Sequence, residues 1–224
     1  MIDLLKALPL FSGLSQESLQ GLTDRAVQQK LKRGDQVFRE GEVGDRIYLI
    51  LDGKVKITRG SPDGRESLLA ILGPGDLFGE LSVFDPGPRT ATATALDHLE
   101  IASVTHDQIK PWIGTRPEAA EILLQALARR LRRTNDTMSD LIFTDVPGRV
   151  AKALLSLAGR FGVQAGDSVV VEHGLTQEEL AQFVGASRET VNKALADFAH
   201  RGWLQLEQRQ VTILDGERLA RRAR

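Results

Sequence analysis

The sequence predicts an α+β protein in which a glycine-rich antiparallel β-region, one long helix and a second, mainly helical region follow one another along 224 residues. Three observations support this prediction. Ten of the 21 glycines fall between Gly34 and Gly87, where they separate short apolar runs. Apolar residues recur at heptad spacing after Pro117, and two short helices joined by a glycine turn are expected in the last third. At about 100–200 residues per domain, the length allows one large domain or two small ones.

A short helix is expected before the β-region. Ser15 can cap it, and Leu19, Leu22 and Ala26 follow at helical spacing. We therefore expect a short amphipathic helix just before the glycine-rich stretch.

Residues 31–110 predict a compact antiparallel barrel or roll. Glycine recurs too often for a helix, and it separates short apolar runs at residues 37–38, 47–51, 55–57 and 68–72, which we expect to be strands. Asp52-Gly53 and Asp63-Gly64 are typical hairpin turns between such runs. Closely spaced short strands with glycine turns are typical of small barrels and rolls.

A long helix is expected from Pro117, which suits a first helical turn. Apolar positions then recur with alternating spacings of four and three, which is an a/d seam. The seam consists of Ala120, Leu124, Leu127, Leu131, Thr134, Met138 and Leu141. One interpretation is a helix lying on the core of its own domain. We favour a two-stranded coiled coil between identical chains, because the stripe is as narrow as a strict a/d seam.

Asp145 to Gly148 interrupt the heptad pattern and mark the expected domain boundary. Asp145 can cap a new helix over residues 147–161, with Pro147 in its first turn. A loop is expected over residues 162–167 and a short strand over residues 169–171.

The stretch from Thr176 to Leu195 predicts a helix-turn-helix. Thr176 and Glu179 form a capping box for the first helix. Gly185 can end that helix in a left-handed turn, and Ser187 can cap the second helix. Two capped helices joined by a short glycine turn are typical of this motif.

The second helix carries polar side chains where DNA recognition needs them, because its N-terminal end would enter the major groove. These side chains are Ser187, Arg188, Glu189, Thr190 and Lys193. Arginine can donate two hydrogen bonds to guanine, and glutamate can accept one from cytosine. Residues 204–206 and 211–213 flank a polar turn and predict a hairpin, or wing. The alternative is a helical hairpin with an ordinary solvated charged face.

Residues 78–82 and 89–92 together predict a phosphate site. A glycine followed by a short helical turn presents free N–H groups, which suit a phosphate. Arg89 would supply the countercharge as a bidentate fork, and Glu80 could accept a ribose hydroxyl proton. The alternative is a turn with a surface pair of Arg89 and Glu80.

These segments resemble, in the same order, the cyclic AMP receptor protein family of bacterial transcription regulators. Residues 78–92 resemble the phosphate-binding cassette of cyclic-nucleotide-binding domains. Residues 128–150 resemble the long helix and hinge of the family, and residues 187–191 resemble its recognition helix. The resemblance covers about residues 5–215. It divides the chain into a β-roll domain at 1–116, a dimerisation helix at 117–144 and a winged helix-turn-helix domain at 145–224.

The resemblance implies a homodimer that binds DNA under the control of cyclic AMP, with an inverted-repeat operator and RNA polymerase as partners. The implied nucleotide ligands are Gly79, Glu80, Leu81, Ser82, Arg89, Thr90, Thr134 and Asn135. The implied DNA contacts are Thr176, Ser187, Arg188, Glu189, Thr190, Lys193 and Arg209. Asn135 replaces a serine of the family and Lys193 replaces an arginine. Thr134 is also the lone polar residue of the seam, where a polar group costs stability unless something uses it.

Composition excludes cysteine-based chemistry and gives no sign of a membrane segment. The balance of 29 basic and 30 acidic side chains produces no strong overall field, and the lack of cysteine excludes thiolate catalysis and Cys-ligated metal centres. No apolar run approaches the ~18 residues of a membrane helix, and the first residues lack the pattern of a signal peptide. We therefore expect a cytoplasmic protein without a membrane partner.

Two rival functions remain at this point. The first is a regulator of the same fold that responds to cyclic GMP or another metabolite, or acts without ligand. The second is an enzyme such as a metal-dependent cupin, which usually needs clustered histidines. The four histidines, His98, His106, His173 and His200, are scattered, and no phosphate loop or nucleophile elbow appears. We expect no metal and no catalytic residue.

Overall fold

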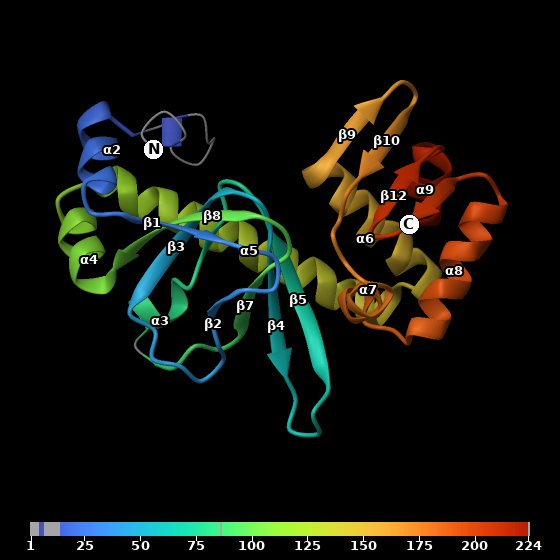
Figure 1. Cartoon of the computed structure of the whole chain (residues 1–224), viewed down its shortest axis with the longest axis horizontal. Coiled ribbons are helices and arrows are strands. Elements are labelled where there is room, and N and C mark those ends of the chain that lie inside the picture. The colour runs from blue at the N-terminus through green and yellow to red at the C-terminus, as the bar shows by residue number, and fades with distance from the viewer. Residues whose placement is uncertain (1–4, 7–13, 86, 224) are drawn as a thin grey trace. The chain divides into compact units, whose positions relative to one another are not determined.

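The structure is a computed structural model that describes residues 5–6, 14–85 and 87–223. It forms two compact units. One contains the described residues up to Arg65 together with Leu69–Arg133, and the other contains the residues from Thr134 onward with Glu66–Leu68. Figure 1 labels helices and strands of both units. The limits of the two units differ from the boundaries expected at 116 and 144, which stay a prediction.

The first unit is an antiparallel β-roll with helices, as the sequence predicts. In chain order its elements are α2 (Gln16–Thr23), β1 (Val27–Leu31), β2 (Gln36–Phe38), β3 (Arg46–Asp52), β4 (Val55–Gly60), β5 (Glu66–Leu72), β6 (Leu77–Phe78), α3 (Leu81–Phe84), β7 (Thr92–Ala95), β8 (Leu99–Thr105) and α4 (His106–Gly114). The first three residues of β5 are the Glu66–Leu68 segment that groups with the other unit. Ser15 accepts a hydrogen bond from the N–H of Ser18 and so caps α2. Gly53 and Gly64 have positive φ angles, which fits the two expected hairpin turns.

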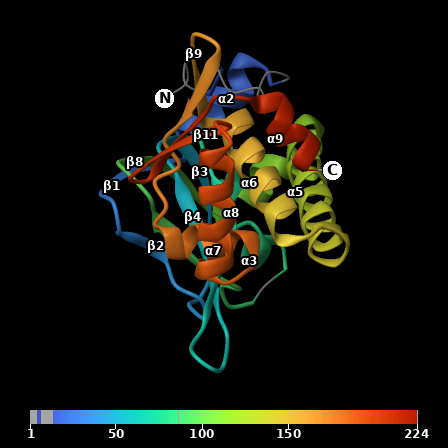
Figure 2. The same cartoon turned by 90° about the vertical axis from the view of Figure 1, so that its right-hand side faces the viewer.

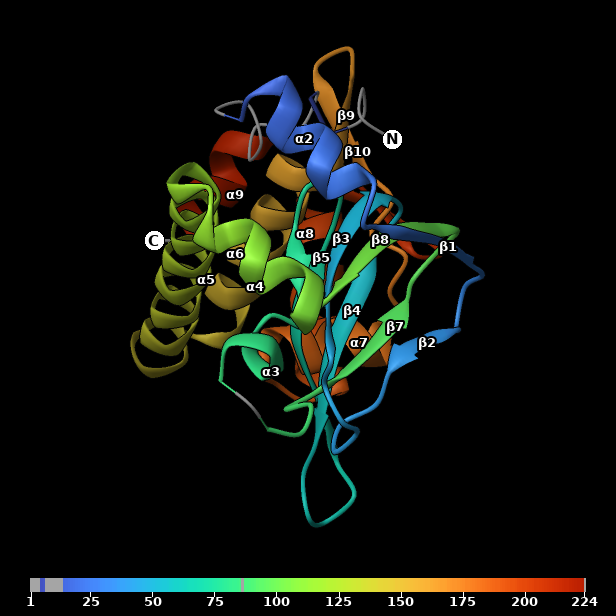
Figure 3. The same ribbon diagram turned by 90° about the vertical axis from the view of Figure 1, so that its left-hand side faces the viewer.

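Two four-stranded sheets build the roll, with the orders β1-β8-β3-β6 and β2-β7-β4-β5. Strand β3 is buried on both faces, since its residues alternate between two apolar clusters. Tyr48 and Ile50 point into the cluster between the sheets with Phe38 and Phe78, whereas Ile47 and Leu49 point outward under the helices. Figure 3 shows α2 and α4 beside the strands of this unit. The sequence had predicted β2 to β5 but not the remaining strands or α4.

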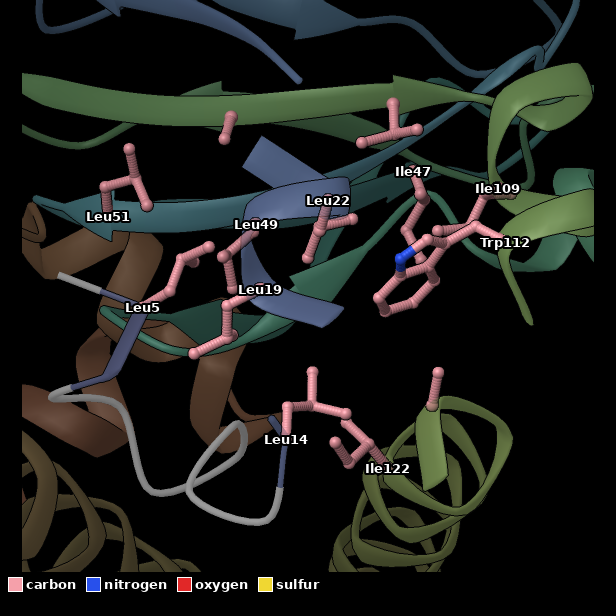
Figure 4. Packing of buried hydrophobic residues seen from close by; sticks show 13 residues of the cluster. Leu5, Leu14, Leu19, Leu22, Ile47, Leu49, Leu51, Ile109, Trp112 and Ile122 are labelled. Carbon is pink, nitrogen blue, oxygen red and sulfur yellow. The ribbon is translucent and has the colours of Figure 1, made fainter. Parts of the chain in front are cut away.

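Helix α5 (Pro117–Phe143) is the expected long helix and begins at the proline. Its first turns pack onto the outer apolar cluster (Figure 4) through Ala119 and Ile122, with Leu123 and Ala126 half-buried beside them. This packed face is not the heptad seam. Leu124 and Leu131 of the seam are 66% and 62% exposed in the single chain.

The second unit begins within α5 and continues through α6 (Val146–Phe161), β9 (Gly162–Ala165), β10 (Ser168–Val171), α7 (Gln177–Val184), α8 (Arg188–His200), β11 (Leu204–Glu207), β12 (Gln210–Ile213) and α9 (Gly216–Arg222). Its strands form one sheet in the order β11-β12-β10-β9, and α6, α7 and α8 form the helix-turn-helix core (Figure 2).

The expected loop over residues 162–167 is wrong. Residues Gly162–Ala165 form β9, which pairs antiparallel with β10 and turns at Gly166, where φ is +61°. The strand was not predicted because Gly162 is typical of a loop. Gly162 ends α6, and a Cβ there would lie 2.4 Å from the carbonyl oxygen of Ala158 and 2.6 Å from Val169 Cγ1. Glycine is needed at this close approach rather than as a loop signal.

The expected helix caps of the second unit are confirmed. Asp145 accepts from the N–H of Gly148, the capping box of Thr176 and Glu179 is complete, and Ser187 accepts from the N–H of Thr190. Gly185 adopts the left-handed conformation at φ 71° and ends α7.

None of the helices that the structure describes combines the length and the apolar composition that a membrane span requires.

Candidate functional site

Arg89 is the centre of the first site. It is 3% exposed, and its guanidinium lies 4.3 Å from the centroid of the Phe38 ring. Its Nη1 donates to the carbonyl oxygen of Gly79 at 2.7 Å, and its Nη2 donates to that of Arg46 at 2.9 Å. Its Nε is buried and has no hydrogen-bond partner among the described residues. A buried cation with an unpaired donor is costly unless an acceptor meets it.

Two glycines make room for this guanidinium. Gly79 has a φ of +75°, and a Cβ there would lie 2.8 Å from Arg89 Nη1. At Gly44, which the sequence analysis did not single out, a Cβ would lie 2.2 Å from Ser82 Cβ and 3.1 Å from Arg89 Nε. Gly44 lies in a glycine-rich stretch where most glycines mark turns, so its sequence context did not distinguish it.

Tyr48 borders the same space. Its ring stacks on Phe78 at 5.1 Å between centroids and lies 5.6 Å from the Arg89 guanidinium carbon. Burial raises the pKa of the Tyr48 hydroxyl, and the positive charge of Arg89 opposes that rise. This wall of aromatic rings excludes water from one side of the guanidinium.

Glu80 is the buried acidic residue beside Arg89. It is 4% exposed, and its Oε1 accepts a hydrogen bond from Arg130 Nη1 at 2.7 Å. Its Oε2 is buried and lacks a partner in the part of the chain that the structure describes. Arg130 was not among the expected ligands, although it directly precedes seam residue Leu131 and so lies on a flank of the seam.

The remaining residues of the expected cassette lie nearby. Ser82 is buried in α3 and its hydroxyl donates to the carbonyl oxygen of Pro88 at 3.4 Å. Leu81 is 44% exposed at the start of α3, and Thr90 is exposed next to Arg89. The structure thus gathers Gly79, Glu80 and Ser82 around Arg89.

Thr134 and Asn135 belong to the second unit and are exposed on α5. Their expected contact with a base in the first unit therefore stays a prediction.

Three of the expected DNA contacts, Thr176, Arg188 and Arg209, line one groove of the second unit. Arg188 begins α8 and its Nη2 lies 3.4 Å from Gln177 Oε1 on α7, while Asn192 Nδ2 donates to the same oxygen at 3.2 Å. Gln177 was missed by sequence reasoning, since nothing in its local pattern separates it from other helix-surface residues. The hydroxyls of Ser187 and Thr190 are 2.8 Å apart.

The other expected DNA contacts are exposed as well. Glu189 and Lys193 lie on α8, and Thr176 caps α7. Arg209 occupies the turn between β11 and β12 with φ 62°, and its carbonyl oxygen accepts from the N–H of Gly174. A groove of about 360 Å³ runs between this turn and α7, with Thr176, Arg188 and Arg209 among its lining residues.

Arg149, another residue that the sequence analysis missed, joins the start of α6 to the helix-turn-helix. It donates to the carbonyl oxygens of Thr144, Val184 and Gly185 at 2.8–3.1 Å. The guanidinium therefore satisfies carbonyls at the C-terminal ends of α5 and α7, which lack partners within their helices.

Comparison with known families decides what these two units are. Residues 28–115 match the cyclic nucleotide-binding domain model, and residues 148–222 match the Crp-like helix-turn-helix domain model. The chain belongs to the CRP family of transcription regulators.

Individual relatives agree with this assignment. The CRP-like cAMP-activated global transcriptional regulator of Mycobacterium tuberculosis is 59% identical over 224 residues, which is 100% of both chains. The cyclic AMP receptor protein of Thermus thermophilus is 35% identical and covers 94% of this chain and 97% of that protein. The crystal structure of Thermus thermophilus catabolite activator protein superposes with a TM-score of 0.54 at 33% identity, covering 96% of this chain and 98% of that one.

This CRP-family chain is therefore a transcription regulator and not an enzyme, which removes the cupin alternative. No group of three or more potential metal ligands occurs among the described residues.

Proposed function

We propose that the first unit binds cyclic AMP as an allosteric ligand. The observation that supports this best is the pair of unsatisfied atoms, Arg89 Nε and Glu80 Oε2, in one buried site. A cyclic phosphate oxygen would accept from Arg89, and a ribose hydroxyl would donate to Glu80. A nucleotide has an acceptor and a donor of this kind, whereas an apolar metabolite has neither.

The N–H groups at the start of α3 would complete the phosphate site, and Ser82 and Thr90 would add hydroxyls. Thr134 would contact adenine, with Asn135 reaching from the partner chain. Asparagine offers both a donor and an acceptor, so it can serve a base as the family's serine does. Cyclic GMP, another metabolite or activity without ligand are the alternative outcomes.

We propose that α5 forms a parallel coiled coil with a second copy. Leu124, Leu131, Met138 and Leu141 of the seam are half or more exposed in the single chain, although they are large and apolar. Burying them against a partner would remove this apolar surface from water. The chain's own core already uses the different face that carries Ala119 and Ile122.

We propose that the dimer binds an inverted-repeat operator with half-sites about 34 Å apart. Arg188 would contact guanine, with Glu189, Thr190 and Lys193 beside it, while Thr176, Ser187 and Arg209 would meet phosphates or flanking bases. RNA polymerase would be the protein partner at the promoter. Operator DNA should tighten nucleotide binding by the same factor by which the nucleotide tightens DNA binding.

The deciding experiment is a calorimetric titration with cyclic AMP, repeated with cyclic GMP and with operator bound. We expect cyclic AMP to bind and operator DNA to strengthen that binding about 5–150-fold. Arg89→Leu should lose at least a few kcal/mol of nucleotide affinity, because the buried phosphate would be left without a countercharge. Unchanged affinity in this variant would contradict the site, and equal operator affinity with and without nucleotide would contradict the switch.

Assembly and DNA reading are tested separately. Leu127→Asp combined with Leu131→Asp should give monomers or insoluble protein in sedimentation, and a folded wild-type monomer at micromolar concentration would contradict the seam. Arg188→Ala should cost about 1–3 kcal/mol per half-site and relax preference at one base position. Arg209→Ala should instead weaken binding to all sequences and reduce its salt dependence.

A further inference from the structure

Gln177, the first residue of α7, reaches across to the start of α8. Its side-chain oxygen Oε1 accepts a hydrogen bond from Asn192 Nδ2 at 3.2 Å and a longer one from Arg188 Nη2 at 3.4 Å. Arg188 and Asn192 are four residues apart on α8, so their side chains lie on the same face of the helix, one turn from each other. One amide oxygen of α7 therefore contacts two successive turns of α8.

The Arg188 guanidinium is otherwise unengaged. Among the residues that the structure describes, it has no carboxylate partner and no second acceptor. A long arginine side chain loses rotamer freedom when it binds, and this loss opposes binding. Gln177 already restricts the side chain in the free protein, so less freedom remains to be lost on DNA. The guanidinium has five N–H donors, so one can go to Gln177 while two remain for O6 and N7 of a guanine.

Asn192 in turn fixes the position of Gln177. Asn192 is half-buried, and its Oδ1 is buried without a hydrogen-bond partner in the described part of the chain. A buried acceptor without a donor is unfavourable, so Asn192 does not adopt this orientation to satisfy its own oxygen. The opposite orientation of the amide would bring Oδ1 against Gln177 Oε1, and both atoms are acceptors. The observed orientation therefore keeps the Gln177 oxygen in place beside Arg188.

From these contacts we infer that Gln177 is a positioning residue for DNA reading. It holds the Arg188 guanidinium at the N-terminal end of α8, which is the end that enters the major groove in this motif. The inference rests on the proposed contact between Arg188 and guanine. It assigns part of the base preference to Gln177, which acts through Arg188 and not through a base contact of its own.

The test measures base preference with the full chain. The probe is the inverted-repeat duplex that the wild-type chain selects from a randomised library with cyclic AMP present, together with duplexes that change one base pair at a time. Fluorescence anisotropy at fixed salt gives the preference at each position as a ratio of two affinities, which is independent of the folded fraction of the sample. Arg188→Ala identifies the position that Arg188 reads, where the preference should fall at least about fivefold. Gln177→Ala should lower the preference at that same position about two- to fivefold and leave the other positions unchanged.

Two control variants separate positioning from other effects. Gln177→Glu keeps the acceptor oxygen, so it should retain the wild-type preference. Its added negative charge should lower the affinity for every duplex alike. Gln205→Ala makes the same change as Gln177→Ala at an exposed position of β11 and should alter no preference. A loss of preference in Gln177→Glu or in Gln205→Ala as large as that in Gln177→Ala would overturn the inference.

A double-mutant cycle distinguishes this inference from the proposed function on which it rests. In the Arg188→Ala background, Gln177→Ala should change the preference no further, because the two residues act through one contact. An undiminished effect of Gln177→Ala in that background, or none in the wild-type background, would overturn the positioning role and leave the base contact of Arg188 intact. If Arg188→Ala alters the preference at no position, the proposed base contact is wrong and the role of Gln177 is overturned with it.

Discussion

Replacing Gly44 by alanine should disrupt the Arg89 site through one steric contact. The new Cβ would lie 2.2 Å from Ser82 Cβ and 2.6 Å from Ser82 Oγ. Non-bonded carbon atoms prefer separations of about 3.5–4.0 Å, so the two residues must move apart by more than about 1 Å. Ser82 is buried at 8% exposure within α3 and has no free space toward solvent. Either the segment at Gly44 or the helix of the cassette must shift.

The magnitude follows from overpacking, which costs about 1–3 kcal/mol in a well-packed interior. For a chain of this length, each kcal/mol lowers the melting temperature by about 2–4 °C. The melting temperature of Gly44→Ala should therefore be about 2–12 °C below that of the wild type. The cyclic AMP affinity proposed for this site should fall as well, because Arg89 Nε lies 3.1 Å from the same Cβ position.

The control and the rescue use the same kind of substitution. Gly159→Ala on α6 places its Cβ in open space and should not lower the melting temperature. In a double-mutant cycle, Ser82→Gly should recover most of the stability lost in Gly44→Ala, since it removes the atoms that the new methyl group meets. If Gly44→Ala unfolds and binds nucleotide like the wild type, the packing argument for this site is refuted.

Three further predictions concern single groups. Hydrogen bonds from Arg222 and from the N–H of Gly148 hold the pKa of the Asp145 carboxyl below its usual range, so Arg222→Gln should raise that pKa in an NMR titration. The stability that the ionised Asp145 contributes is present above about pH 4 and is lost as the pH falls through the lowered pKa. An unchanged Asp145 pKa in the variant would contradict the ion pair. Burial raises the pKa of Tyr48, the chain's one tyrosine, and the charge of Arg89 opposes the rise, so Arg89→Leu should raise this pKa further in a tyrosinate absorbance titration. The stability that comes from the neutral hydroxyl is present below about pH 10 and is lost as the pH rises through the raised pKa. A fall in that pKa would refute the assigned contact. Gly159→Ala should stabilise α6 by up to about 1 kcal/mol in thermal unfolding, because alanine is the better helix former, and destabilisation would show that the position is not open.

Local signals in the sequence were enough for the elements whose causes are local. Four helices are capped by a side-chain oxygen that accepts from the N–H three residues later, a relation visible in the sequence. The capping residues are Ser15, Asp145, Thr176 and Ser187. Gly185 ends α7 for a similarly local reason. The heptad spacing after Pro117 likewise identified the long helix.

The same sequence did not predict β9, because Gly162 is required by its distance from Ala158 and Val169 rather than by a loop. It identified the heptad seam of α5 but not the second apolar face, which packs on the chain's own core. Ala119 and Ile122 pack inward while Leu124 and Leu131 stay exposed, and both sets are apolar.

The sites divide in the same way. The sequence alone shows a glycine turn, an acidic residue and an arginine, from which we predict a phosphate site, and it shows polar residues at the start of α8. Only the tertiary structure decided that Arg130 joins Glu80 and that Gly44 abuts Ser82. These contacts join residues about 40 to 50 positions apart. Since periodicity and capping report only neighbours within a few turns, no local pattern could have predicted them.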